Sequence, residues 1–183
     1  MVDLTVSAGK SGYHSGEVGG IVPETFRVIR ALLNRLDDPL TGKCMKELET
    51  ELPSYVRPEA ERMVALSGHE MCKKYKMHEG VEYCSQDDLI EMYLNNTWRA
   101  NLSITGAAGL PHFSKAGNVV RANTTVRVSM RLPPNKDAHE AAAQIKEKLS
   151  TNVPHNCKVD IHGNHDGNGW CMKEPAEWLH DTM

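Results

Sequence analysis

The chain has 183 residues, a length that favours one domain or one domain with an elaboration. Its 21 Lys and Arg against 24 Asp and Glu give a formal net charge of −3, and the lack of a basic excess argues against a nucleic-acid partner. No apolar run approaches the roughly 18 residues of a membrane span, so we expect no membrane partner. Five cysteines are an odd number, which argues against a disulfide framework and favours reduced thiols in the cytoplasm.

The N-terminal segment predicts a strand, a turn and a helix. Apolar and polar residues alternate over 4–8, as expected of a half-buried strand. A glycine-rich turn, SGYHSGEVGG, follows over 11–20. Apolar residues then recur three and four positions apart, which predicts an amphipathic helix over 23–36. Pro23 suits the first position of that helix.

Residues 40–92 have a different character. Pro53 and Pro58 interrupt the segment, and a helical pattern resumes over 60–71. The apolar content is too low for an independent core. We therefore expect a mostly helical insertion and not a second domain.

The second half of the chain predicts two strands, a helix and a last strand. The first strand ends at Gly106, and a loop leads into a long strand over 118–132. In that strand Val126 and Val128 fall on one face, whereas Arg127 and Arg131 fall on the other. A second amphipathic helix and a short alternating segment follow, over 138–149 and 157–161.

The predicted order is therefore strand, helix, strand, strand, helix, strand. This βαββαβ order is typical of an α+β fold, a two-layer ferredoxin-like sandwich in which both helices cover one face of an antiparallel sheet. The segment 40–92 would be inserted into it.

Two side chains are candidates for chemistry on local grounds. His14 lies among glycines, which let the backbone approach a ligand closely and expose the imidazole; a solvated loop histidine is the simpler interpretation. Arg131 ends the long strand on its non-core face, where a guanidinium can hold a carboxylate through two hydrogen bonds. A surface salt bridge would explain Arg131 equally well.

A structural zinc site is a weaker alternative. Its ligands would be Cys157, His162, His165 and Cys171, since zinc takes four convergent nitrogen or sulfur ligands. The spacing is irregular, however, and the strand pattern places Cys157 on the core face and His162 on the opposite face. A core cysteine and turn histidines are the better interpretation.

Four segments in order carry a family resemblance: YHSGEVGGIVP at 13–23, TWRANLSITG at 97–106, GNVV at 117–120 and VSMRLPP at 128–134. With them the chain, from residue 3 to about 170, resembles the lid or dimerisation domain of the M20 family of zinc metallopeptidases. The resemblance implies a lid over 1–170 and the start of a return into a catalytic domain over 171–183.

In that family the lid is inserted into a catalytic domain that holds two zinc ions. The resemblance therefore implies no metal ligand in this chain and no activity of the chain alone. It also implies a homodimer formed through the lid, the catalytic domain of the parent enzyme as a partner, and a peptide substrate. The parent enzyme would hydrolyse peptide or amide bonds next to a free carboxylate, as a dipeptidase does.

The resemblance carries three residue roles to this sequence. His14 matches a histidine that reaches into the other subunit's active site, where it stabilises the oxyanion. Asn118 matches a position that gives substrate a polar contact. Arg131 matches the arginine that binds the substrate's terminal carboxylate. The alternative from another class is a free-standing ferredoxin-like regulatory module that binds a small ligand such as an amino acid.

Overall fold

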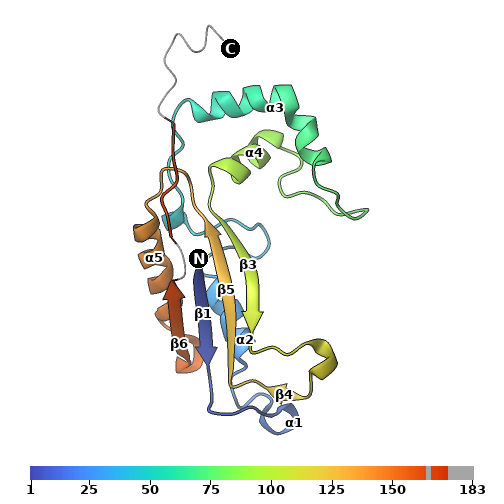
Figure 1. Cartoon of the computed structure of the whole chain (residues 1–183), viewed down its shortest axis with the longest axis vertical. Helices are drawn as coiled ribbons and strands as arrows, with labels where there is room; N and C mark the ends of the chain where they lie inside the picture. The colour runs from blue at the N-terminus through green and yellow to red at the C-terminus, as the bar shows by residue number, and fades with distance from the viewer. Residues whose placement is uncertain (164–165, 173–183) are drawn as a thin grey trace.

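The computed structural model describes residues 1–163 and 166–172. Its centre is a four-stranded sheet in the order β3-β5-β1-β6, in which every neighbouring pair is antiparallel (Figure 1). The strands are β1 (Val2–Ser7), β3 (Asn101–Ala108), β5 (Asn123–Arg131) and β6 (Lys158–Gly163). The predicted α+β class and antiparallel sheet are confirmed.

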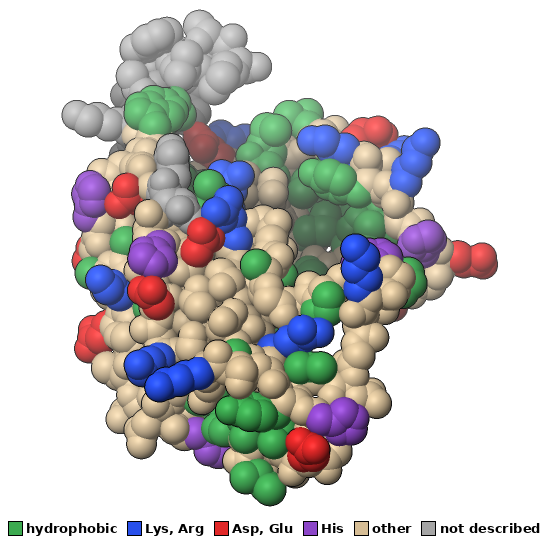
Figure 2. All heavy atoms as spheres, turned by 60° about the horizontal axis from the view of Figure 1, so that its bottom comes forward, with side chains coloured by type: hydrophobic (Ala, Val, Ile, Leu, Met, Phe, Trp, Pro, Cys, Tyr) green, Lys and Arg blue, Asp and Glu red, His purple; other side chains and the backbone are tan. Residues whose placement is uncertain are grey.

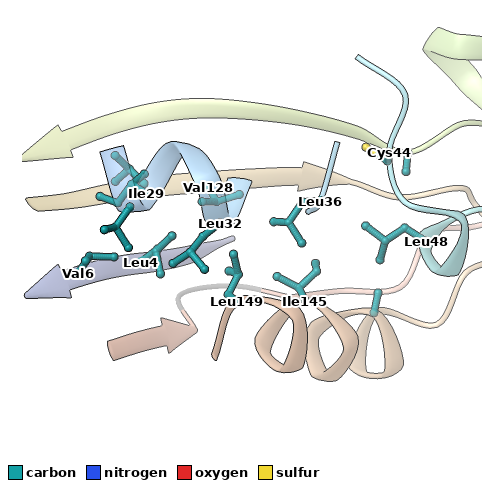
Figure 3. Close-up of a cluster of buried hydrophobic side chains, with 14 residues drawn as sticks. Leu4, Val6, Ile29, Leu32, Leu36, Cys44, Leu48, Val128, Ile145 and Leu149 are labelled. Carbon is teal, nitrogen blue, oxygen red and sulfur yellow. The ribbon is translucent and has the colours of Figure 1, made fainter. Parts of the chain in front are cut away.

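Two helices, α2 (Thr25–Leu33) and α5 (Ala138–Ser150), pack on one face of this sheet. Figure 3 shows the core that they form, with side chains from both helices directed at those of β1 and β5. The core is mainly aliphatic, and it includes Leu4, Val6, Ile29, Leu32, Val126, Val128, Ile145 and Leu149. Burial of these side chains is the main force that holds the two layers together.

A separate two-stranded ribbon lies beyond the end of the sheet where β5 begins. Its strands are β2 (Tyr13–His14) and β4 (Val119–Val120), and the single helical turn α1 (Ser15–Val18) follows β2 directly. The short η2 (Phe113–Lys115) lies in the loop before β4. Figure 1 shows this ribbon at the bottom of the molecule.

The helical part of the segment that was predicted as an insertion lies at the opposite end, shown at the top of Figure 1, whereas Cys44 and Leu48 of the same segment belong to the main core. The segment contains η1 (Lys46–Leu48), the long helix α3 (Val56–Lys73) and the first turn of α4 (Leu89–Thr97). The two α-helices share a small cluster of their own, in which Val56, Ala60 and Leu94 are buried. Tyr55 at the start of α3 also donates to the carbonyl of Met172. Residues 173–183, most of the predicted return segment, lie outside the described residues.

The bounds of several predicted elements differ in the structure, and local hydrogen bonds explain two of the differences. The helix predicted over 23–36 begins at Thr25, because the Glu24 carboxylate caps it by accepting from the amides of Phe26 and Arg27 at 2.8 and 2.7 Å. The strand predicted over 118–132 is divided into β4 and β5. The carbonyl of Ala122 accepts from Ala8 and Gly9 at this break.

The remaining described element is the short η3 (Pro154–Asn156), which connects α5 to β6. Within the described part of the chain, no helix combines the length and the apolar character that crossing a membrane requires.

Candidate functional site

His14 is the exposed N-cap residue of α1. Its Nδ1 accepts a hydrogen bond from the amide of Gly16 at 3.1 Å. The imidazole is not covered by aliphatic packing, so a ligand can reach it. Figure 2 shows hydrophobic side chains gathered at this end of the molecule with histidine beside them; the exposed large hydrophobic residues of β2, β4 and α1's flanks are Tyr13, Val119 and Ile21.

Asn118 lies beside His14. The two residues are brought together because β2 pairs with β4 in the register His14↔Val119, and because the amide of Ser15 donates to the carbonyl of Asn118 at 2.8 Å. The Asn118 side chain is exposed. The structure therefore joins two of the three sequence-predicted site residues at one end of the fold.

Arg131 lies at the other end of β5, with its side chain exposed. Asp3 holds the neighbouring cation, Arg127, through two hydrogen bonds of 2.7 and 2.8 Å. No carboxylate of residues 1–163 or 166–172 forms an ion pair with Arg131. The surface salt bridge that the sequence left open for Arg131 is therefore absent from the described residues.

A cavity of about 770 Å³ adjoins Arg131. It lies between the end of the sheet and α5, and its walls include Met1, Ser129, Asp166 and Asn168. The Asn168 side chain accepts from the amide of Ala138 at 2.8 Å, which ties this wall to the first residue of α5. The cavity falls within the size range of small-molecule sites.

The sheet separates the two groups of candidate residues. β5 runs from Asn123, near the ribbon, to Arg131. At about 3.3 Å per residue, its eight steps span roughly 26 Å. His14 and Arg131 of one chain therefore cannot contact the same dipeptide-sized molecule.

The alternative zinc site is not supported by the described residues, which contain no group of three or more His, Cys, Asp or Glu able to hold a metal ion. Cys157 packs against the core, whereas the exposed His162 lies 3.1 Å from Asp160 through its Nε2. His165, the third proposed ligand, lies outside the described residues. The described residues thus do not supply a zinc site.

All five cysteines are free thiols. Burial, with smaller contributions from Asp37 and Glu49, raises the pKa of Cys44 to about 12, and burial also raises the pKa of Cys157. Because the thiolate is the nucleophile, neither thiol is suited to nucleophilic catalysis at neutral pH.

Sequence reasoning did not select Gly16, whose amide holds the His14 ring. The signal was present in the order His-Ser-Gly, in which a side-chain acceptor stands two residues before a glycine amide. Sequence reasoning also missed Glu49, whose Oε1 accepts from the amide of Ala100 at 3.1 Å. No local pattern relates two residues so far apart in the chain.

These observations define an α+β domain with an exposed imidazole at one end. At the other end lies a guanidinium that has no ion-pair partner among the described residues. No protein-family model matches the chain, and no curated protein matches its sequence.

Solved structures do share its fold. Human carnosine dipeptidase 1 matches with a TM-score of 0.72 and 19% identity, over 97% of this chain and 38% of its own. The Saccharomyces cerevisiae di-peptidase Dug1p matches with a TM-score of 0.62 and 22% identity, over 94% of this chain and 36% of its own. An M20 family metallo-carboxypeptidase from Sulfolobus solfataricus matches with a TM-score of 0.66 and 16% identity, over 88% of this chain and 36% of its own.

The chain thus spans little more than a third of the length of these peptidases, 36 to 38%. Nearly all of it corresponds to one part of each of them. The resemblance to the M20 lid that the motifs indicated is confirmed at the level of the fold.

Proposed function

We propose that this chain is the lid and dimerisation domain of an M20 zinc metallopeptidase that hydrolyses peptide or amide bonds next to a free carboxylate. The observation that carries the proposal is the fold match to human carnosine dipeptidase 1 over 97% of this chain. Because the match covers one part of a larger enzyme, we favour a lid over a free-standing ligand-binding module. The two zinc ions would belong to a catalytic domain, and we place the enzyme in the cytoplasm.

The lid architecture that we propose is a ferredoxin-like sandwich. Its support is the strand order β3-β5-β1-β6 with α2 and α5 in the two crossover connections. In this order each crossover skips one strand, and the skipped strand runs antiparallel to both of its neighbours. The helices therefore lie on one face and leave the other face polar.

His14 would act on the substrate carbonyl. An exposed imidazole that is anchored through Nδ1 can donate from Nε2 to the oxygen that gains negative charge during hydrolysis. Asn118, adjacent to His14 across the ribbon, would offer a second polar contact. Neither residue has to be buried in the isolated domain, because the rest of the enzyme would enclose the site.

Arg131 would bind the free carboxylate of the substrate. A guanidinium without an ion-pair partner among the described residues, beside a cavity of about 770 Å³, suits bidentate carboxylate recognition. The distance of roughly 26 Å along β5 means that His14 and Arg131 serve one substrate only if they come from two copies of the chain. This separation supports the proposed homodimer.

The Arg131 role can be tested on the chain as it is. NMR titration with a dipeptide should shift signals around Arg131, and the C-terminally amidated dipeptide should not shift them. Arg131→Ala should abolish the shifts, whereas Arg121→Ala, a change of the same kind outside the cavity lining, should retain them. Equal effects of both dipeptides would contradict a carboxylate site. Peptide hydrolysis by the chain alone with added zinc would contradict the lid assignment.

The His14 role requires a catalytic domain. We would replace the corresponding part of human carnosine dipeptidase 1 with this chain, confirm folding by circular dichroism, and measure carnosine hydrolysis. His14→Ala should lower kcat about 10²–10³-fold, the usual effect of losing one oxyanion donor. His14→Gln should retain more activity than His14→Asn, since the Gln amide reaches the Nε2 position. A folded His14→Ala chimera with unchanged kcat would refute the role.

A further inference from the structure

Gly16 has a contact that singles it out among the glycines of the turn after β1. Its amide N–H points at Nδ1 of His14, with 3.1 Å between the two nitrogen atoms. His14 is the N-cap of α1, with φ −62° and ψ 128°. Ser, Thr, Asp or Asn ordinarily accepts from an amide at this position. Here an imidazole nitrogen takes that place.

The hydrogen bond determines where the imidazole carries its proton. A neutral imidazole has one N–H donor and one acceptor nitrogen. Since Nδ1 accepts from Gly16, its lone pair is used and the hydrogen must be on Nε2. The two ring nitrogens point in diverging directions, so Nε2–H is directed away from Gly16.

We infer that Gly16 is a positioning residue, which fixes His14 as the Nε2–H tautomer and orients that N–H as an outward donor. The inference rests on the proposed function, because it specifies which atom of His14 would meet the substrate oxygen. With the opposite tautomer, Nε2 would present a lone pair to an oxygen that is gaining negative charge, and the interaction would be repulsive.

The position also favours glycine. A Cβ on residue 16 would lie 3.0 Å from Nδ1 and 3.1 Å from Cε1 of His14, closer than ordinary van der Waals contact. The ring would have to shift by a few tenths of an ångström, which would lengthen the hydrogen bond and weaken its hold on Nδ1. The backbone next to His14 is held in place by two hydrogen bonds. The Ser15 amide donates to the Asn118 carbonyl, and the Gly19 amide donates to the Ser15 carbonyl at 2.9 Å.

His112 provides an internal comparison. It caps η2 in a similar way, and its Nδ1 lies 3.3 Å from the amide of Ser114. The Ser114 hydroxyl, however, lies only 2.7 Å from the same nitrogen and can donate or accept. The Ser114 amide can only donate, so the same argument makes Nδ1 of His112 an acceptor, to which the Ser114 hydroxyl can add a second donor.

The test is NMR of the ¹⁵N-labelled chain at a pH about two units above the ordinary histidine pKa of roughly 6.5, where imidazoles are neutral. Long-range ¹H–¹⁵N correlations distinguish a protonated ring nitrogen from an unprotonated one. We expect His14 to show an unprotonated Nδ1, a protonated Nε2, and a scalar coupling between Nδ1 and the Gly16 amide nitrogen across the hydrogen bond.

Gly16→Ala should lose this coupling and shift both ring nitrogens toward values averaged over two tautomers. Gly117→Ala is the matched control, because a Cβ there meets nothing within 4 Å, and it should leave the His14 signals unchanged. A protonated Nδ1 in the wild-type chain would overturn the inference even if the Ala variant did not fold. Unchanged His14 signals in a folded Gly16→Ala variant would overturn it too.

The measurement uses neither substrate nor metal. An Nε2–H tautomer together with a fully active His14→Ala chimera would refute the proposed role of His14 and leave the tautomer assignment intact. An Nδ1–H tautomer together with a His14→Ala chimera of low activity would refute the role of Gly16 alone.

Discussion

Glu49 is a half-buried acid that links the end of η1 to the start of β3. Its Oε1 accepts from the Ala100 amide at 3.1 Å, whereas Oε2 is buried and has no hydrogen-bond partner among the described residues. Burial raises the pKa of Glu49; the Ala100 hydrogen bond and the charge of Arg99 offset part of this rise. Folding therefore favours the protonated carboxyl, and ionisation of Glu49 costs stability.

We expect Glu49→Gln to change the pH dependence of stability. Below the ordinary Glu pKa of 4.5 both forms carry a neutral group, so their free energies of unfolding should differ little. As pH rises through the raised pKa of Glu49, wild type loses stability that the variant keeps. The difference should grow to about 1 kcal/mol, the scale of one poorly satisfied buried polar group.

Urea unfolding of both proteins from pH 4 to 8 would measure this difference. The exposed Glu51 supplies the control, because Glu51→Gln removes a charge nearby without removing a buried one. A pH-independent difference for Glu49→Gln would contradict the assignment.

At the scale of elements, the sequence predicted most where hydrophobic periodicity was strong. The alternation along β5 predicted both faces correctly: Val126 and Val128 are buried, and Arg127 and Arg131 are exposed. A strand inside a sheet has one buried face, so its side-chain pattern contains the required information.

The ribbon that carries His14 was not predictable in the same way. β2 and β4 have two residues each, too few for any periodicity, and α1 has four. Their structure depends on long-range backbone hydrogen bonds such as that from Ser15 to Asn118. The motifs indicated both site residues through resemblance, but only the fold places them together.

Gly109 controls how the loop after β3 returns to β5. Its φ is +85°, and a Cβ there would lie 2.7 Å from the Asn123 carbonyl oxygen and 3.1 Å from the Thr124 Cα. Because backbone atoms surround the position, no side chain can move aside to make room. Gly109→Ala should therefore destabilise the protein by about 2–4 kcal/mol, from left-handed strain and the clash together.

Thermal unfolding of Gly109→Ala beside Gly106→Ala would measure the effect. Gly106 lies in β3 itself, and the nearest atom to its Cβ would be Arg127 Cβ, at an ordinary 3.7 Å. We expect Gly106→Ala to change stability by less than about 1 kcal/mol. Equal losses in the two variants would show that alanine destabilises this part of the chain wherever it is placed, and that the close approach of Gly109 to the backbone is not the cause.

At the scale of the whole molecule, β3 is an edge strand with mostly exposed residues. A groove of about 610 Å³ beside it is lined by residues of α2, including Arg27 and Arg30, and by Leu102. Edge strands pair readily with a second copy. We propose that two chains pair along β3 about a twofold axis, which makes the joined strands antiparallel.

In such a pair the β5 strands of the two copies run in opposite directions. The end with His14 in one copy then lies at the same end as Arg131 of the other. The two β5 strands would be separated by three strand spacings, about 14 Å in all, whereas roughly 26 Å separates the two ends within one copy. In such a dimer, His14 of one copy would therefore lie nearer to Arg131 of the other copy than to Arg131 of its own.

Complementation between two inactive proteins tests this arrangement. In the carnosine dipeptidase chimera, His14→Ala and Arg131→Ala should each have low activity alone. If each site takes His14 from one copy and Arg131 from the other, a mixed dimer contains one site with both residues intact. Random subunit exchange should then restore about a quarter of wild-type activity, since half of the dimers are mixed and one of their two sites is complete.

Light scattering before and after mixing would confirm that the chimeras are dimers, and a labelled subunit would show that they exchange. His14→Ala mixed with a second His14→Ala preparation is the matched control and should gain nothing. If His14 and Arg131 acted from the same copy, every site in the mixed dimer would lack one of them. Exchange without any gain in hydrolysis would therefore exclude the shared site, because the mixed dimers would be present and still inactive.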